Sequence, residues 1–130
     1  MTNKKLIQKA ASLIRPVKIQ NYLIGDVGCA LVTDKNHIFV GVCADLCSGM
    51  GFCAEKAAIA AMITEGEFKI KTIVAVWKNE KGENQILPPC GSCRELIRQV
   101  HQDNLQTAII LKTSEIVKLE VLLPHHNWFG

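Results

Sequence analysis

Two short stretches of this chain carry residue types that could do chemistry together. Cys53-Ala54-Glu55 and Pro89-Cys90-Gly91-Ser92-Cys93 offer three thiols and one carboxylate. Three cysteine sulfurs suit a zinc ion that keeps its fourth position open for water. Each stretch is predicted to open a helix, where unpaired N–H groups and the helix dipole favour the thiolate over the thiol. Together the two stretches predict a zinc site with an acid beside it.

Glu55 is better placed to move a proton than to bind the metal. It follows Cys53 by two residues, and helical side chains share a direction only at spacings of three or four. We therefore assign Glu55 as the catalytic residue and Cys53, Cys90 and Cys93 as metal ligands. Three thiolates leave a net negative charge on a zinc site, which opposes the activation of bound water. Lys56 is the predicted charge compensation at the zinc.

Arg94 is a second candidate for that compensation, with a plain surface position as its alternative. Other uses of the cysteines also compete with the catalytic site. A closed structural zinc would need a fourth ligand such as Cys43 or Cys47, and it would leave Glu55 without a role. Three disulfides are not needed in a chain of this size, and a C-x-x-C pair at a helix start favours metal or redox chemistry in a reducing compartment. Cys29, Cys43 and Cys47 are interpreted as core or loop residues.

The composition is that of an ordinary globular protein. The 130 residues, 48% of them hydrophobic and 21% charged, predict a single domain over residues 1–130. No apolar run reaches the roughly 18 residues of a membrane span, and residues 1–9 lack an apolar secretory core, so we expect a cytoplasmic protein without a membrane partner. The net charge of +3 is small, and the few aromatic residues are not interleaved with basic ones. Nucleic acid is therefore not an expected partner.

Hydrophobic periodicity predicts an α/β fold with three layers, α/β/α, around a mixed sheet of five strands. A first amphipathic helix is expected to end at Pro16, which cannot continue it. The glycines of the loop over residues 43–52 would let the backbone approach a ligand closely. The expected strands lie within 22–33, 38–42, 72–77 and 107–111, the next helices over 53–64 and 90–101, and a short strand and helix around 115–123. Both cysteine-bearing helices would begin beyond the carboxyl ends of strands, where sites of α/β sheets form.

The two motifs resemble the H-x-E…P-C-x-x-C signature of zinc nucleobase deaminases, with Cys53 as the first ligand in place of histidine. In this form the chain resembles the small homotetrameric cytidine deaminases and the blasticidin-S deaminases. The resemblance extends over most of the chain, through Val27-Gly28-Cys29-Ala30-Leu31, Gly41-Val42, and Leu122-Leu123-Pro124 with Trp128.

The resemblance implies a zinc-dependent hydrolase that converts a cytosine nucleoside of the cytidine or deoxycytidine type to its uracil form and releases ammonia. Glu55 would move protons while an activated water attacks C4 of the ring. Ala54 would contact the base through its backbone, Pro89 would fix the approach to Cys90, and Pro88 would present its carbonyl to the departing ammonia. The resemblance also implies a homotetramer whose sites are completed by neighbouring chains. In the related tetrameric enzymes an arginine stands at the position of Lys56.

The substrate-binding set departs from the cytidine deaminases. Where those enzymes bind ribose with an asparagine and a glutamate, this chain has Cys43 and Asp45. Their stacking phenylalanine aligns near Gly25 of this chain. Trp128-Phe129-Gly130 is similar to the tail of blasticidin-S deaminases, with simple packing as the alternative use. A modified cytosine nucleoside such as blasticidin S is therefore the alternative substrate. A deaminase of nucleic acid and a non-catalytic zinc protein are the rival hypotheses.

Overall fold

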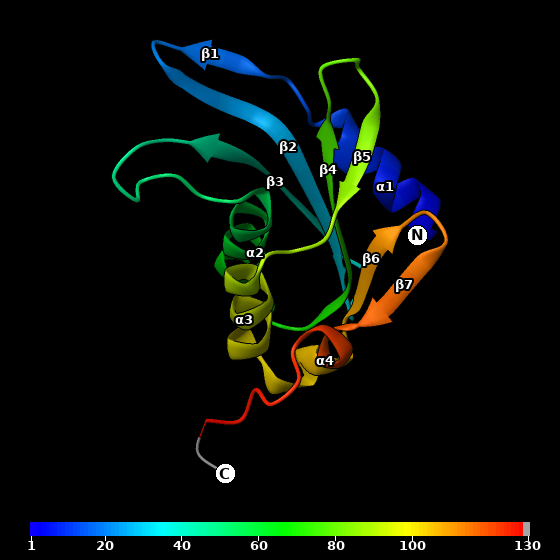
Figure 1. The fold of residues 1–130 in the computed structure, drawn as a ribbon. Coiled ribbons are helices and arrows are strands. Elements are labelled where there is room, and N and C mark those ends of the chain that lie inside the picture. The colour runs from blue at the N-terminus through cyan, green and yellow to red at the C-terminus, as the bar shows by residue number, and fades with distance from the viewer. Residues whose placement is uncertain (129–130) are drawn as a thin grey trace.

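Five strands lie side by side in a mixed sheet in the order β3-β2-β4-β6-β7 (Figure 1). The structure is a computed structural model that describes residues 1–128, so Phe129 and Gly130 lie outside the described residues. Only β4 and β6 run parallel, and the other neighbours are antiparallel. The strands are β2 (Tyr22–Thr33), β3 (Ile38–Asp45), β4 (Ile70–Lys78), β6 (Ala108–Lys112) and β7 (Glu115–Lys118).

Two short strands bring the described sheet to seven, so the predicted number of five was too low. β1 (Val17–Ile19) pairs with the start of β2, and β5 (Asn84–Leu87) pairs with the end of β4. All three residues of β1 are exposed, and β5 has no fully buried residue. Neither strand therefore carries the alternation of buried and exposed residues by which a strand is found in a sequence.

Helices cover both faces of the sheet, which confirms the predicted mixed α/β fold (Figure 1). α1 (Asn3–Ser12) lies on one face, and α2 (Ala54–Thr64) and α3 (Gly91–Val100) lie on the other. A short 3-10 helix, η1 (Gln102–Gln106), and α4 (Leu119–Leu122) complete the described elements. Within residues 1–128 we find no helix with the length and apolar character needed to span a membrane.

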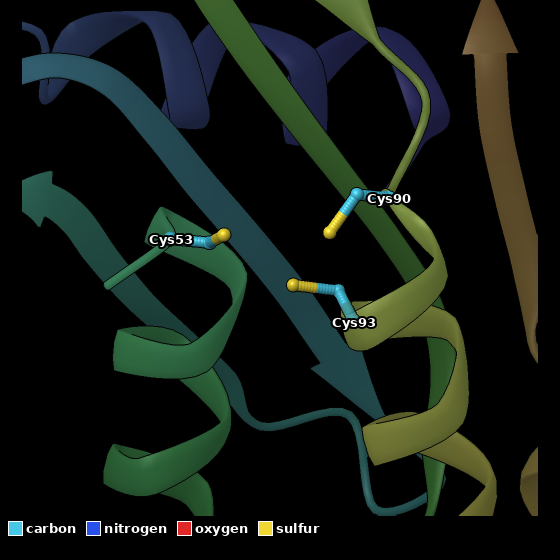
Figure 2. Close-up of side chains that lie close together, drawn as sticks. All are labelled: Cys53, Cys90 and Cys93. Atoms are coloured by element: carbon cyan, nitrogen blue, oxygen red, sulfur yellow. The ribbon is translucent and has the colours of Figure 1, made fainter. Parts of the chain in front are cut away.

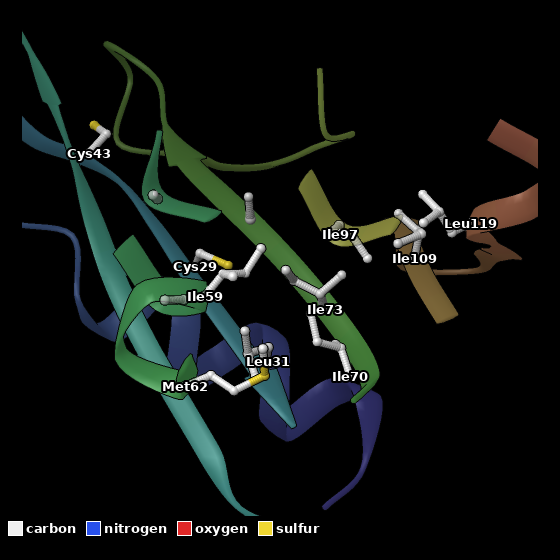
Figure 3. Close-up of a cluster of buried hydrophobic side chains, with 13 residues drawn as sticks. Cys29, Leu31, Cys43, Ile59, Met62, Ile70, Ile73, Ile97, Ile109 and Leu119 are labelled. Carbon is white, nitrogen blue, oxygen red and sulfur yellow. The ribbon is translucent and has the colours of Figure 1, made fainter. Parts of the chain in front are cut away.

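The central strands are buried on both faces, and their side chains alternate between two cores. In β2, Cys29 and Leu31 point toward α2 and α3, whereas Ala30 and Val32 point toward α1. This alternation follows from the two-residue repeat of a strand. It also explains why residues 72–77 read as a continuous apolar run. Figure 3 shows the core under α2 and α3, which contains Ile59 and Met62 of α2, Ile97 of α3, and Ile73 and Ile109 of the sheet.

Gly41 lets α2 approach the sheet more closely than any larger residue would. A Cβ at this position would lie 2.5 Å from the Cβ of Ala57 and 2.5 Å from the backbone nitrogen of Ala58. Contacts this short force the neighbouring backbone to move. The pairing of a glycine on β3 with alanines on α2 therefore sets the height of the helix above the sheet, and with it the position of Cys53 at the helix start.

Candidate active site

Three cysteine thiols converge between the starts of α2 and α3 (Figure 2). Cys53 is the N-cap of α2, Cys90 is the N-cap of α3, and Cys93 lies in the first turn of α3. Neither N-cap cysteine uses its side chain to cap its helix. The three Sγ atoms all lie within 4.8 Å of one another. That span suits three sulfurs around one zinc ion, which stands at about 2.3 Å from each sulfur in protein sites.

Among residues 1–128, no further histidine, cysteine or carboxylate belongs to this cluster. Cys47 is exposed, and Cys43 belongs to a different group of side chains. Cys29 lies fully buried in the sheet as a core residue. The described part of the chain thus offers three ligands of the soft, tetrahedral kind that zinc prefers and leaves a fourth position to a small molecule.

The local environment treats the three thiols differently. Backbone N–H groups of Cys93 and Ser92 at the start of α3 lower the pKa of Cys90, although burial opposes them. Burial raises the pKa of Cys53 and raises the pKa of Cys93 far above its usual range, and the charge of Glu55 adds to both shifts. A cation bound between the three sulfurs would favour their thiolate forms, as in a metal centre.

Glu55 lies in the first turn of α2 with 7% of its surface exposed. Burial raises the pKa of its carboxyl group, while its own backbone N–H and the charge of Lys56 act in the opposite direction. A carboxyl group whose pKa is moved toward neutrality can both accept and return a proton. The position and the environment of Glu55 thus suit a general acid and base beside the cysteine cluster.

The two basic residues proposed for charge compensation make other contacts in the structure. Lys56 Nζ donates a hydrogen bond of 2.9 Å to Ser92 Oγ and so links α2 to α3. Arg94 donates to two backbone carbonyls, from Nε to Pro89 O at 2.8 Å and from Nη1 to Leu122 O at 3.1 Å. Arg94 therefore holds the segment that leads into Cys90.

A cavity of about 480 Å³ opens beside the cysteine cluster. It brings together Glu55 and three of the residues predicted to bind substrate, namely Cys43, Asp45 and Ala54. Two other predicted residues, Pro89 and Trp128, do not line the cavity. The neighbouring Pro88 lines its wall in place of Pro89. The ring of Trp128 lies over Arg98 of α3, with its centre 5.7 Å from the guanidinium carbon. The cavity has the size and mixed lining of a small-molecule site.

Sequence reasoning did not assign several residues of the cavity wall, among them Asp26, Leu46 and Phe52. Phe52 had a usable signal in the sequence, because this aromatic residue directly precedes Cys53. Asp26 had none that is local. It stands in β2 where the register with β3 shifts between Ile24 and Gly28, and this irregularity accompanies its position at the cavity.

Asp26, Cys43 and Asp45 form a second group in the same cavity wall. Their ligand atoms also lie within 4.8 Å of one another, and Cys43 Sγ donates to Asp26 Oδ1 at 2.9 Å. Burial, with this hydrogen bond, raises the pKa of Cys43 to about 11, so the group is a neutral thiol at pH 7. The pKa of Asp45 is raised by burial and then by the charge of Asp26.

Residues 1–109 match the family model described as the zinc-binding region of cytidine and deoxycytidylate deaminases. The chain belongs to this family. The chain is similar to a cytidine deaminase from Mycoplasma genitalium, 35% identical over 78 residues, which cover 58% of this chain and 57% of that protein. A blasticidin-S deaminase from Bacillus cereus is 32% identical over 105 residues, which cover 75% of this chain and 74% of that protein.

The extent of these matches differs between the relatives. A probable cytidine deaminase from Dictyostelium discoideum is 34% identical over 70 residues, 53% of this chain and 46% of that protein. The chain thus spans about half of the length of the two cytidine deaminases that it matches. The match to the blasticidin-S deaminase is the longest of these three.

Solved structures of cytidine deaminases share the fold over the whole chain. The enzyme from Mycobacterium tuberculosis superposes with a TM-score of 0.76 at 23% identity, over 100% of this chain and 98% of that one. The enzyme from Burkholderia pseudomallei superposes with a TM-score of 0.75 at 24% identity, over 98% of this chain and 100% of that one. The arrangement of helices and sheet that positions the cysteines is therefore the arrangement of this family.

Proposed function

We propose that this chain is a zinc-dependent deaminase that hydrolyses a cytosine nucleoside to its uracil form and ammonia. The observation that carries the proposal is the convergence of Cys53, Cys90 and Cys93 at two helix starts. Two of these cysteines, Cys53 and Cys90, line one cavity together with buried Glu55. Membership of the zinc-binding deaminase family supports the same assignment. The three free thiols would have to stay reduced, so we propose the cytoplasm as the compartment.

The ion supported by this donor set is zinc, with Cys53, Cys90 and Cys93 as its ligands. When bound, zinc would supply the positive charge that lowers the pKa of a water molecule and makes it a nucleophile at neutral pH. The backbone N–H groups at the start of α3, which lower the pKa of Cys90, would offset part of the negative charge of the thiolates. The ammonium group of Lys56, held by Ser92, adds a nearby positive charge.

Glu55 performs the proton transfers in this proposal. Its carboxylate accepts a proton from the attacking water and passes it to ring nitrogen N3. It then accepts the second proton from the hydroxyl group now on C4 and passes it to the amino group, which leaves as ammonia while the C4 carbonyl forms. One water is consumed and one ammonia is released, so the reaction needs no further reactant. The backbone of Ala54 and the wall around Pro88 lie in the same cavity as Glu55 and would orient the base. The buried position of the carboxyl group limits competition from solvent.

The alternative substrate is a modified cytosine nucleoside, such as the one for which the Bacillus cereus relative is named. Cys43 and Asp45 support this alternative. Both line the cavity, and they stand where the cytidine deaminases have the asparagine and the glutamate that bind ribose. A thiol is a weak hydrogen-bond donor, and aspartate is one methylene shorter than glutamate. We therefore expect plain cytidine to be a poor substrate, by roughly two to three powers of ten in kcat/KM relative to the preferred compound.

Ammonia release tests the proposed function directly. The zinc-loaded protein is incubated with cytosine, cytidine, deoxycytidine and blasticidin S, and kcat/KM is compared on one preparation. Release of ammonia from at least one nucleoside, with little from cytidine, supports the proposal. A high kcat/KM with cytidine would contradict the expected substrate preference but not the deaminase function. Zinc binding without ammonia from any compound would favour a non-catalytic zinc protein.

A homotetramer is the assembly that we propose for this chain. Two sets of apolar side chains are exposed. Val17, Ile19 and Leu23 belong to the β1–β2 hairpin, and Leu46 and Phe52 line the cavity. Burial of such side chains between copies would stabilise an oligomer. Light scattering at micromolar concentration is expected to give four times the chain mass of 14.3 kDa. A monomer under these conditions would exclude the tetramer.

A further inference from the structure

The segment that leads Cys90 into the cysteine cluster cannot fix its own path. β5 ends at Leu87, and Pro88 and Pro89 occupy the two positions before Cys90, where the chain enters α3 (Figure 2). Proline has no backbone N–H, so neither residue can donate a backbone hydrogen bond. Pro89 is buried, and a carbonyl group inside a protein is normally paired with a donor. The position of Cys90 therefore depends on a donor outside this segment.

Arg94 supplies that donor and a second one beside it. Its side chain donates from Nε to Pro89 O at 2.8 Å, and its backbone N–H donates to Cys90 O at 2.9 Å. The two carbonyls belong to the peptide groups on either side of the Cα of Cys90. Because a peptide group is planar, a hydrogen bond to its oxygen restrains the orientation of the whole group. One residue thus holds both of the peptide planes that flank Cys90.

The far end of the Arg94 side chain is anchored to α4. Nη1 donates at 3.1 Å to the carbonyl of Leu122, the last residue of that helix. The last carbonyls of a helix have no partner within the helix, so this acceptor is available to a side chain. The guanidinium group is planar and rigid, and it can serve two acceptors from different elements at once. Within residues 1–128, Arg94 forms no ion pair with a carboxylate.

We propose that Arg94 is a positioning residue of the zinc site, which places Cys90 through the Pro89 carbonyl and not through its charge. This inference rests on the proposed function, because it takes Cys90 as a zinc ligand. Each sulfur of such a site must reach about 2.3 Å from the ion, within about 0.2 Å. Cys93 is buried inside α3, whereas Cys90 is exposed and precedes the helix. Packing therefore constrains Cys90 less than Cys93, and the hydrogen bonds from Arg94 supply the constraint.

Metal affinity and a metal spectrum test this inference without turnover. In Arg94→Ala, the dissociation constant for zinc, measured by competition with a chromophoric chelator, is expected to rise about ten- to a hundredfold, as is typical when a group that orients a metal ligand is removed. The ligand-field bands of cobalt(II) bound in place of zinc depend on the coordination geometry. These bands are expected to differ in position and intensity between Arg94→Ala and the wild type.

Arg94→Lys separates the position of the ligand from the charge of the side chain. Lysine keeps a positive charge but lacks the planar fork, so it cannot serve Pro89 O and Leu122 O together. We therefore expect Arg94→Lys to show the same direction of change in zinc affinity and in the cobalt(II) spectrum. Lysine also keeps most of the aliphatic stem, so Arg94→Lys provides the test if Arg94→Ala does not fold.

Arg98→Ala is the matched control. Arg98 lies one turn further along α3, where it pairs with Glu95 and lies under the ring of Trp128. The substitution removes the same group from the same helix but leaves the Pro89 carbonyl paired. Zinc affinity and the cobalt(II) spectrum of Arg98→Ala should equal those of the wild type.

The outcomes that would overturn the inference are specific. A wild-type zinc affinity and cobalt(II) spectrum in Arg94→Ala, even with a lower Tm, would show that Arg94 stabilises the fold alone. Wild-type behaviour of Arg94→Lys would show that a positive charge is sufficient. If the wild-type protein binds zinc but releases no ammonia from any cytosine compound, the proposed function is wrong, and the metal measurements still support or overturn the role of Arg94.

Discussion

Glu55→Gln is expected to give a folded, zinc-loaded protein whose kcat is lower by about two to four powers of ten. Glutamine keeps the size and the hydrogen-bonding shape of the side chain but cannot carry a proton between the attacking water, N3 and the amino group. The cysteine ligands are unchanged, so metal content should remain at about one zinc per chain. The measurements are ammonia release on the preferred substrate and zinc by elemental analysis of the same sample.

Glu65→Gln is the matched control for this variant. Glu65 is exposed at the other end of α2 and lies outside the cavity, so removal of its charge should leave both kcat and zinc content at wild-type values. Turnover by Glu55→Gln near the wild-type rate would show that another group moves the proton. Loss of zinc from that variant would instead show that Glu55 contributes to the metal centre.

Cys90→Ala is expected to abolish stoichiometric zinc binding and, with it, activity. Cys90 is the exposed member of the cluster, whereas Cys93 is fully buried, so Cys90→Ala removes a ligand while leaving no cavity in the core. At a free zinc concentration about a thousandfold above the dissociation constant, zinc binding stabilises the folded state by about 4 kcal/mol. The variant should lose most of this stabilisation. Zinc content and thermal unfolding, with and without a chelator, provide readouts that do not depend on turnover.

Two comparisons make this result specific. Cys47→Ala removes an exposed cysteine outside the cluster and should keep both zinc and the wild-type Tm. Chelator should lower the Tm of the wild type toward that of Cys90→Ala and leave the Tm of Cys90→Ala almost unchanged. Full zinc content in Cys90→Ala would contradict the assignment of Cys90 as a ligand.

Local sequence features predicted the elements that carry the candidate site. The sequence predicts the helices that follow Cys53 and Cys90 at nearly their observed bounds. Alanine content and amphipathic spacing are local features, so they indicate a helix without knowledge of its partners. The apolar run at 72–77 predicts a strand covered on both faces, and β4 confirms it. The short strands β1 and β5 were missed, since pairing with β2 and β4 defines them and their own side chains do not.

The types of the reactive groups and their order along the chain follow from the sequence alone, because three cysteines and a glutamate at two helix starts already define a donor set. Which of these groups share a cavity depends on how the elements pack. The tertiary structure brings Asp26 to Cys43, 17 residues away, and Lys56 to Ser92, 36 residues away, while Trp128 lies on Arg98. Such distant pairs depend on strand register, on the irregularity in β2 and on the height of α2 above Gly41. These are properties of packing between elements, and no local pattern of residues encodes them.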